Sequence, residues 1–346
     1  MGDEHDVLEK LPEFISRSGY RQVFVLADEN TLRYCYPILE PLLDNHVVIH
    51  FPAGESHKTL NTSASVWQQL LHYEADRNAL LINLGGGTVT DLGGFVAGCY
   101  KRGIDFVNIP TTLLGMVDAA TGGKTGIDFA GYKNALGLFR KPVKVFLHTP
   151  FLHTLPEREF MSGMAEVIKH ALIADRKMFE NLPDDCRLTN HSDLHQLVIE
   201  NIKIKNRFVS ADFHDNGIRM ALNYGHTIGH ALESLWLEKQ QLMLHGEAVA
   251  GGILAESYLS HRTGLLSAEE LEKVTKKITK NFRLPIVPAE DFGALMHYLR
   301  NDKKNRNGKI TCCLLSEIGS YSLPHFIEEG LITDALNYYN LTVCNG

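Results

Sequence analysis

The sequence predicts two domains, an α/β Rossmann-like domain over residues 1–155 and an all-α domain over residues 156–346. Short β-branched runs alternate with helical stretches up to about residue 150, whereas long amphipathic segments follow Pro156. The 346 residues also exceed the size at which a single hydrophobic core keeps growing. We therefore expect the domain boundary near residue 155, within TLPERE.

The first half contains predicted strands separated by helix-like stretches such as SASVWQQLLHYEADR. Apolar strands without polar alternation are buried on both faces, which is typical of a parallel sheet covered by helices. This pattern indicates a doubly wound, Rossmann-like domain. The predicted strands are QVFVLADEN, HVVIHFP, ALLINLGGG, DFVNIPTT and VKVFLHTP.

The second half consists of predicted amphipathic helices. Apolar residues recur there at helical spacing, for example Met164, Ile168, Ala171 and Leu172 on one stripe. The predicted helical segments are EREFMSGMAEVIKHALIADRKMFE, SDLHQLVIENIKIKNRFV, GIRMALNYGHTIGHALESLW, GEAVAGGILAESYLSHR and SAEELEKVTKKITKNF.

Composition favours an enzyme that acts on small molecules. The formal net charge is -7 and basic residues form no runs, which argues against nucleic acid as a partner. The six cysteines show no CxxC spacing, so we expect reduced thiols in a cytoplasmic protein. The N-terminus lacks the apolar core of a secretory signal, and no stretch reaches the roughly 18 apolar residues of a membrane span. We expect a soluble protein.

A glycine-rich turn follows the third predicted strand. In LINLGGGTVTDLGG, Gly85, Gly86 and Gly87 stand where the strand ends and a helix begins. Glycines there let backbone amides approach a pyrophosphate, and the helix N-terminus adds a favourable potential. Because the glycines are consecutive and do not form GxGxxG, a packing turn without a ligand stays open as the alternative.

Polar side chains follow the other predicted strands. Beyond the carboxyl ends of parallel strands, such groups can meet a ribose or base, and threonines and lysines suit phosphate. Each residue is also common in ordinary turns. The candidates are Asp28, Asn30, Glu55, Lys58, Thr111, Thr112, Asp118, Lys124, Lys133 and Asn134.

The segment from Arg219 to His230 is the most informative part of the second half. In a single helix, spacings of four, three and four place Arg219, Asn223, His226 and His230 on one face. Apolar neighbours surround this polar stripe, so we expect it to line an internal cleft. A solvated helix face is the alternative.

A metal bound by His226 needs ligands from neighbouring helices. Glu166 lies within a helix among apolar residues, where an unpaired carboxylate is costly, and His245 opens a helix. We predict a metal site of Glu166, His226 and His245 with open positions. The HTIGH sequence lacks the glutamate of HExxH and is not a zincin motif.

Five runs in order span nearly the whole chain: GGGTVTDLGGFVAGCYKRGIDFVNIPTTLLGMVDAATGGKTGID, KNALGLF, LPEREFMSGMAEVIK, NYGHTIGHALE and HGEAVAGG. These runs resemble the 3-dehydroquinate synthase family. The resemblance implies an N-terminal NAD-binding domain and a helical metal- and substrate-binding domain. It also implies zinc or cobalt in the cleft between the domains, and a homodimer.

The resemblance further implies a role for individual residues. The implied metal ligands are Glu166, His226 and His245. The implied substrate-binding and catalytic set is Asp118, Lys124, Asn134, Lys169, Lys205, Arg219, Asn223 and His230, with Arg102 donated across the dimer. The implied NAD contacts are Asp28, Asn30, Glu55, Lys58, Gly86, Gly87, Asp91, Thr111, Thr112 and Lys133. A late lysine motif corresponds to Asp302, Lys303 and Lys304.

Some positions depart from the family pattern. Thr90 stands where glycine is common, Ala120 where serine is common, and Phe213 interrupts a usually acidic run. A longer stretch, WLEKQQLML, precedes His245. We expect these departures to affect loop geometry or substrate choice without removing a ligand.

The reaction implied by the resemblance is that of a phosphate-eliminating carbon–oxygen lyase of the shikimate pathway. It converts 3-deoxy-D-arabino-heptulosonate 7-phosphate to 3-dehydroquinate by transient NAD-dependent oxidation, phosphate elimination, re-reduction, ring opening and aldol closure. In this hypothesis the metal polarises the C5 hydroxyl, Lys124, Asn134, Lys169 and Arg219 hold the phosphate, and His230 handles protons.

Three alternatives stay open at this point. Another sugar phosphate cyclase is the nearest. A metal-dependent alcohol or glycerol dehydrogenase would accumulate NADH and would not need the phosphate-directed lysines. A non-catalytic NAD-binding scaffold would need no metal site.

Overall fold

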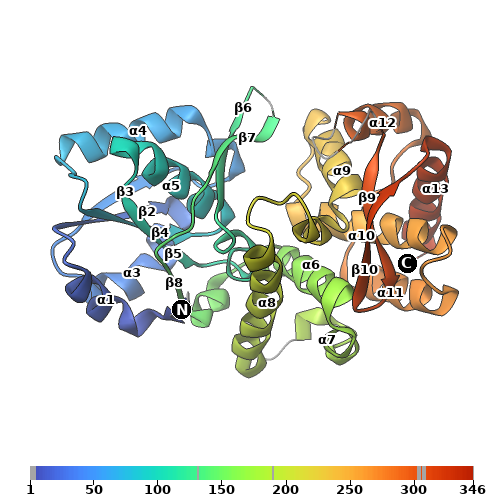
Figure 1. Ribbon diagram of the computed structural model, residues 1–346, viewed down its shortest axis with the longest axis horizontal. Helices are drawn as coiled ribbons and strands as arrows, with labels where there is room; N and C mark the ends of the chain where they lie inside the picture. Colours follow the sequence, from blue (N-terminus) through green and yellow to red (C-terminus); the bar gives the residue numbers. More distant parts are fainter. Residues whose placement is uncertain (1–4, 131, 189–190, 302–304, 306–308, 346) are drawn as a thin grey trace. The chain divides into compact units, whose positions relative to one another are not determined.

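The computed structural model describes residues 5–130, 132–188, 191–301, 305 and 309–345. The chain forms two compact units, Met1–Pro156 and Glu157–Gly346 (Figure 1). The late motif at residues 302–304 lies outside the described residues. Within the described part of the chain, no helix combines the length and apolar character needed to cross a membrane.

A six-stranded sheet forms the centre of the first unit, in the order β1-β8-β5-β4-β2-β3. All of its strand pairs are parallel, which confirms the predicted Rossmann-like sheet. β4 is buried along its whole length, as the apolar run predicts. The strands are β1 (His5–Val7), β2 (Gln22–Asp28), β3 (Val47–Phe51), β4 (Ala79–Gly85), β5 (Asp105–Pro110) and β8 (Lys144–Leu147).

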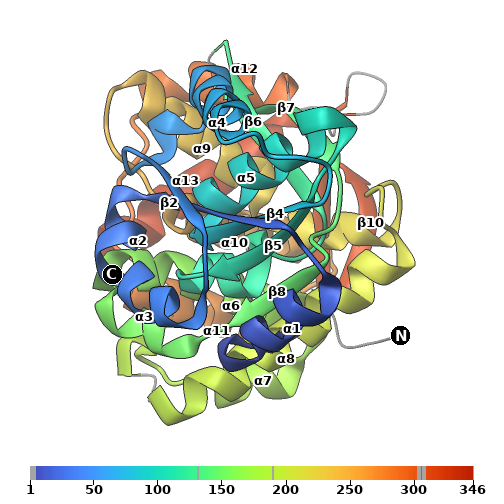
Figure 2. The same cartoon turned by 90° about the vertical axis from the view of Figure 1, so that its left-hand side faces the viewer.

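Helices cover both faces of this sheet. α4 (Leu60–His72) and α5 (Gly87–Cys99) lie on one side, and α1 (Leu11–Ser18) and α3 (Tyr36–Leu39) lie on the other (Figures 1 and 2). The short α2 (Glu29–Tyr34) follows β2. Full burial of each large apolar side chain contributes about 1.5–3 kcal/mol. The core on the α4 and α5 side includes Phe24, Val66, Leu81, Leu92 and Phe106.

A β-hairpin of β6 (Lys124–Phe129) and β7 (Tyr132–Phe139) forms a separate antiparallel pair in the first unit. Every residue of β7 is exposed. A Cβ atom on Gly137 would lie 2.4 Å from the carbonyl oxygen of Thr125, so glycine permits the close strand approach. Lys124, Lys133 and Asn134 of this hairpin were predicted as ligand contacts, whereas the hairpin itself was not predicted.

The second unit is built around α10 (His245–Arg262). This helix contacts α6, α9, α11 and α13, and it is buried continuously from Ala248 to Ala255. A helix that is apolar on all sides is typical of a core position. The helices described in this unit besides α10 are α6 (Glu157–Ala174), α7 (Arg176–Asn181), α8 (His191–Ala211), α9 (His226–Glu238), α11 (Ala268–Asn281), α12 (Phe292–Arg300) and α13 (Glu329–Asn345).

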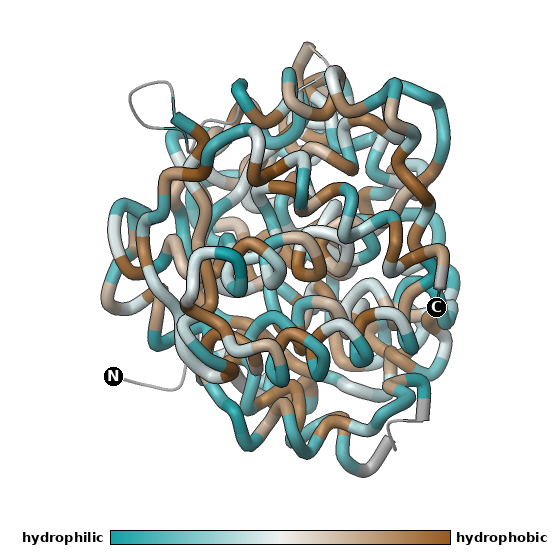
Figure 3. Tube along the Cα trace, turned by 90° about the vertical axis from the view of Figure 1, so that its right-hand side faces the viewer, coloured by the Kyte–Doolittle hydropathy of each residue, from teal (hydrophilic) through white to brown (hydrophobic). Residues whose placement is uncertain are grey.

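The predicted helical character of the second unit is confirmed, with one addition. β9 (Thr311–Glu317) and β10 (Ser320–Phe326) form a two-stranded antiparallel sheet, and β9 contacts α10. Figure 3 shows how hydrophobic and hydrophilic stretches alternate along the helices, as amphipathic packing requires.

The predicted single helix from Arg219 to His230 is wrong. A 3₁₀ helix covers Ile218–Asn223 and α9 begins only at His226, so the polar residues do not share one helix face. Gly225 breaks the segment with a left-handed backbone angle, φ +77°. The neighbouring helix α10 packs closely against this break, because a Cβ atom on Gly252 would lie 1.8 Å from the carbonyl oxygen of Gly225.

Candidate functional site

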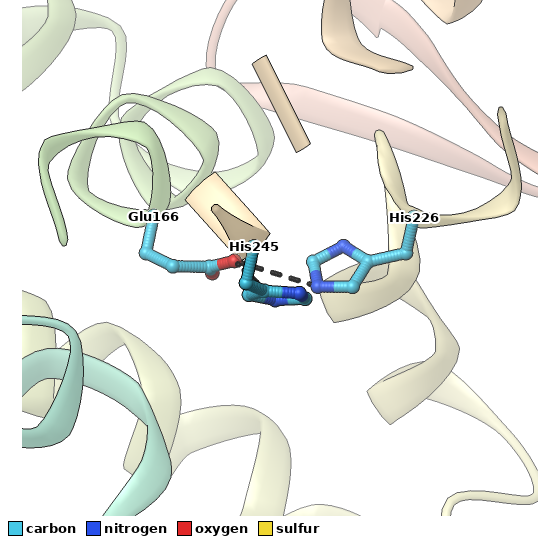
Figure 4. A group of neighbouring side chains, drawn as sticks. All are labelled: Glu166, His226 and His245. Carbon is cyan, nitrogen blue, oxygen red and sulfur yellow. Dashed lines mark ion pairs between the residues drawn. The ribbon is translucent and has the colours of Figure 1, made fainter. Parts of the chain in front are cut away.

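Three side chains from three helices of the second unit form a candidate metal centre. Glu166 comes from the middle of α6, and His226 and His245 are the first residues of α9 and α10. Their ligand atoms all lie within 4.8 Å of one another (Figure 4). The Nε2 atoms of His226 and His245 are 3.4 Å and 3.8 Å from Oε1 of Glu166. One carboxylate and two imidazoles suit zinc or cobalt and leave coordination positions open.

The carboxylate of Glu166 fits a bound cation. Its side chain is 0% exposed, and neither oxygen accepts a hydrogen bond of regular geometry. The Lys169 ammonium pairs with Oε2, and ring nitrogens of His170, His226 and His245 lie within 4.0 Å of the carboxylate. A buried carboxylate without hydrogen bonds is costly, and a divalent metal ion offsets that cost.

Close helix packing places His245 beside Glu166. Gly246 donates its N–H to Oγ of Ser162, one turn before Glu166, at 3.0 Å. A Cβ atom on Gly246 would lie 2.0 Å from the carbonyl oxygen of Ser162, so only glycine allows α6 and α10 to approach this closely. The long stretch WLEKQQLML that precedes His245 therefore does not displace this residue from the group.

Four further candidates of the second unit lie on α6, α8 and the 3₁₀ helix. Lys169, Lys205 and Arg219 are buried cations, exposed by 1%, 4% and 3%. Nη1 of Arg219 donates to the carbonyl oxygen of Phe213 at 2.7 Å. Because this acceptor is a backbone carbonyl oxygen, having Phe213 where the family usually has an acidic residue does not remove the hydrogen bond. Asn223 ends the 3₁₀ helix and is half-buried.

His230 lies one turn after His226 on α9. Its ring centroid is 5.2 Å from that of His226 and 5.9 Å from that of His245. It is half-buried, and its ring therefore lies beside the two ligand histidines.

Three loops of the first unit carry candidate nucleotide contacts where parallel strands end. Asp28 ends β2 and caps α2 by accepting from the Thr31 N–H at 2.8 Å. Gly86 caps the N-terminus of α5, where a Cβ atom would lie 2.8 Å from the Thr112 side chain. Thr111 follows β5 and donates its N–H to Gly85 at 3.1 Å. Because the strands are parallel, these loops share one edge of the sheet, as a nucleotide site requires.

Lys58 brings together residues that are far apart in the sequence. Its ammonium lies 2.8 Å from Oε1 of Glu55, 2.9 Å from Oδ1 of Asn134 and 3.5 Å from Oδ2 of Asp91. Asp128 adds a carboxylate oxygen at 3.8 Å. Lys58 is 3% exposed, so the centre of this network is buried within the first unit.

The network also shifts ionisation. Burial alone raises the pKa of Glu55, but the ammonium groups of Lys58 and Lys133 outweigh burial and hold that pKa below its ordinary value. For Asp128 burial prevails, and its pKa is raised despite Lys58. The carboxylates in turn raise the pKa of Lys58 against the effect of burial, so the lysine stays charged.

The other predicted residues of the first unit lie on several elements. Asp118 lies in a π-helical turn, Gly115–Ala119, and Lys124 begins β6. Asn30, Arg102 and Lys133 are exposed. Two of the residues that depart from the family pattern, Thr90 and Ala120, take part in local hydrogen bonds. Thr90 donates to the carbonyl oxygen of Gly86, and the carbonyl oxygen of Ala120 accepts from Asn108.

Comparison with known proteins identifies the family. A family model described as 3-dehydroquinate synthase N-terminal matches residues 48–162, and one described as 3-dehydroquinate synthase C-terminal matches residues 163–305. A 3-dehydroquinate synthase of Parabacteroides distasonis is 40% identical over 337 residues, 96% of each chain. The chain belongs to the 3-dehydroquinate synthase family. The resemblance drawn from the motifs is confirmed.

Two solved structures share the fold of this family member over its length. A 2-deoxy-scyllo-inosose synthase, complexed with carbaglucose-6-phosphate, NAD⁺ and Co²⁺, has a TM-score of 0.86 at 25% identity and covers 96% of this chain and 95% of its own. A 2-epi-5-epi-valiolone synthase from Streptomyces hygroscopicus, with NAD⁺ and Zn²⁺ bound, has a TM-score of 0.85 at 25% identity. The match covers 100% of this chain and 97% of that synthase.

Sequence reasoning missed several residues of these two regions. Asp128 and Thr88 join the Lys58 network, Thr88 by donating to Glu55 at 2.6 Å. On α9 and α10, Glu233 and Glu256 are buried carboxylates that the candidate set omitted. Both stand within apolar helical stretches, the same signal that singled out Glu166, so the sequence could have revealed them.

Proposed function

We propose that this chain is 3-dehydroquinate synthase, a phosphate-eliminating carbon–oxygen lyase of the shikimate pathway and so of chorismate and aromatic amino-acid biosynthesis. Its substrate is 3-deoxy-D-arabino-heptulosonate 7-phosphate, and its products are 3-dehydroquinate and phosphate. The observation that carries the proposal is the group of Glu166, His226 and His245, in a chain that matches named synthases over nearly its whole length.

The cofactors we propose are NAD and Zn²⁺ or Co²⁺. Glu166, His226 and His245 would hold the metal ion, and the strand-end loops with Gly86, Asp28 and Thr111 would hold NAD. When bound, the metal acidifies the substrate hydroxyl and NAD⁺ takes up and returns a hydride. The remaining proposed NAD contacts are Asn30, Glu55, Lys58, Gly87, Asp91, Thr112 and Lys133.

The buried cations of the second unit are suited to the phosphate. Lys169, Lys205 and Arg219 are withdrawn from water, where their charge–charge interactions are stronger than at the surface. They stabilise the negative charge that grows on the phosphate as its bond to carbon breaks. Asn223 is proposed as a further substrate contact.

We assign proton transfer near the ring oxygen to His230, because imidazole titrates near neutral pH and this ring lies beside two ligand histidines. Further substrate contacts in the first unit are proposed for Asp118, Lys124 and Asn134.

We further propose a cytoplasmic homodimer to which Arg102 contributes in trans. The support for association is the hairpin, where the large apolar side chains of Phe129, Tyr132 and Phe139 are exposed by 48%, 73% and 47%. Exposed apolar side chains gathered on one element are typical of an interaction surface. Sedimentation equilibrium gives the mass in solution, and a monomer would overturn this part of the proposal.

One assay tests the activity. The protein receives the heptulosonate phosphate, NAD⁺ and Zn²⁺ or Co²⁺, while phosphate release and NADH absorbance are followed together. Phosphate release without net NADH is the expected result, and His226→Ala is the matched inactive control. Net NADH without phosphate would identify a dehydrogenase instead.

A second candidate is a sugar phosphate cyclase with another substrate, because two structural neighbours are synthases of other products. The same assay with glucose 6-phosphate or sedoheptulose 7-phosphate separates the two. Turnover of either sugar phosphate in place of the heptulosonate would favour the second candidate.

A further inference from the structure

Glu233 is a buried carboxylate on α9 that lies behind one of the candidate metal ligands. Its residue is 6% exposed, and its Oε2 atom is 3.5 Å from Nδ1 of His245. The other ring nitrogen of His245, Nε2, lies 3.8 Å from Oε1 of Glu166. The imidazole of His245 therefore stands between two carboxylates, with one nitrogen toward each.

The other ligand histidine has the same arrangement with a different acceptor. Nε2 of His226 lies 3.4 Å from Oε1 of Glu166, and its Nδ1 lies 3.2 Å from the carbonyl oxygen of Tyr224. Each histidine thus presents Nε2 to Glu166 and Nδ1 to an oxygen. For His226 that oxygen is neutral backbone, and for His245 it belongs to a carboxylate.

A metal ion bound at Nε2 requires one tautomer of each histidine. A nitrogen that binds a metal must have its lone pair free, so the proton has to sit on the opposite ring nitrogen. An oxygen beside Nδ1 accepts that proton in a hydrogen bond, fixes the ring orientation and makes Nε2 a stronger donor to the metal. A carboxylate does this more strongly than a carbonyl group because it is charged.

We propose that Glu233 is a positioning residue for His245, and that it raises the affinity of the centre for Zn²⁺ or Co²⁺ without binding the ion itself. The inference rests on the proposed metal-dependent function. A rival arrangement exists, because His230, Glu233 and His245 also have ligand atoms within 4.8 Å of one another. Glu166 favours the first group, since its carboxylate is fully buried and accepts no regular hydrogen bond.

The test measures metal affinity directly, by competition with a chromophoric chelator and without substrate or NAD. Glu233→Ala should bind Zn²⁺ about 10- to 100-fold more weakly than the unaltered protein. Glu233→Gln, which keeps the shape and an acceptor but loses the charge, should fall between the two. Glu238→Gln is the control, because Glu238 lies on the same helix, accepts from Tyr298 at the surface and should leave affinity unchanged.

Melting temperatures of the metal-free proteins separate positioning from a purely structural role. A structural role would lower the melting temperature of Glu233→Gln and leave its affinity for Zn²⁺ intact, which would overturn the proposal. If Glu233→Ala does not fold, Glu233→Gln alone decides by the same criterion.

His230→Ala distinguishes a positioning carboxylate from a direct ligand. Unchanged Zn²⁺ affinity is expected, and weakened affinity would place the ion in the rival group and overturn the proposal. The unaltered protein is the reference for the proposed function: if it binds no metal, the proposed metal site fails, whereas normal binding with an unaffected Glu233→Ala refutes only the role of Glu233.

Discussion

The two candidate regions of this protein balance their charges in opposite ways. Around Lys58, one ammonium is surrounded by the carboxylates of Glu55, Asp91 and Asp128, so the cation is supplied by the chain itself. Around Glu166, three histidines and a lysine approach a carboxylate that accepts no regular hydrogen bond. The first region is complete without a ligand, whereas the second gains a stronger partner for its carboxylate when a metal ion binds.

The regions also differ in what positions their side chains. In the first unit, loops at strand ends are held by ion pairs and side-chain hydrogen bonds, such as those of Lys58 with Glu55 and Asn134. In the second unit, helix crossings at Gly225 and Gly246 set where the histidines begin their helices. The comparison teaches that side-chain charges determine one site and backbone packing determines the other.

The largest effect should come from Glu166→Gln. This change keeps the shape of the side chain and removes the charge that the metal ion would compensate, so we expect turnover to be abolished. Zn²⁺ affinity should fall by more than roughly 100-fold, the upper end of the loss that is typical when a residue hydrogen-bonded to a metal ligand is replaced. Chelator competition measures this, with Glu157→Gln at the exposed start of α6 as the control. Retained metal binding would remove Glu166 from the site.

Gly225→Ala should cost about 3 kcal/mol of unfolding free energy, because it combines backbone strain with a clash. The new Cβ would lie 2.7 Å from Cγ1 of Ile253. Gly264→Ala is the matched control, since Gly264 has nearly the same backbone angle, φ +76°, and nothing within 4 Å. Urea denaturation should show a loss of about 1 kcal/mol for the control. Equal losses would mean that the helix crossing does not constrain the start of α9.

Lys58→Met should destabilise the first unit by about 2 kcal/mol, because it leaves the surrounding carboxylates without their cation. It should also weaken NAD binding, since Glu55 and Asp91 lose the contact that orders them. Thermal denaturation and NAD titration measure the two effects. Arg77→Met, at an exposed cation of the turn before β4, is the control for stability. An unchanged melting temperature would refute the importance of the network.

The stability deficit of Lys58→Met should shrink in acid. The pKa of Glu55 is lower in the folded protein than its ordinary value of 4.5, so its ionised carboxylate stabilises the fold above pH 4.5. This contribution is lost as the pH falls through the pKa of the folded protein. In the variant that contribution is absent, and protonation relieves repulsion among the remaining carboxylates. Melting temperatures of both proteins from neutral pH to below 4.5 measure the gap. A constant gap would show that these carboxylates do not respond to Lys58.

Much of the fold could be predicted because it depends on local pattern. The apolar run of β4 and the stripe at Met164, Ile168 and Ala171 report burial directly. Glu166, His226 and His245 could be nominated from residue type and position within their helices, and the structure brings their ligand atoms together.

Other features depend on contacts that sequence distance hides. The break at Gly225 lies where Gly252 of another helix approaches, and the presence of a glycine between Arg219 and His230 does not by itself reveal that packing. The contact of Lys58 with Asn134 joins residues 76 positions apart. The β6–β7 hairpin likewise lacks the alternation of a half-buried strand, because all of β7 is exposed.

The crossing of α6 and α10 at Ser162 and Gly246 has a consequence for engineering. Backbone atoms in contact fix the separation of the helices that carry Glu166 and His245, so the side chains at these two positions can be exchanged on an unaltered frame. Replacing Glu166 by cysteine or histidine would change the hardness of the donor set and shift the choice of ion toward softer metals. The same scaffold could then serve as a template for metalloenzymes with new metal preferences.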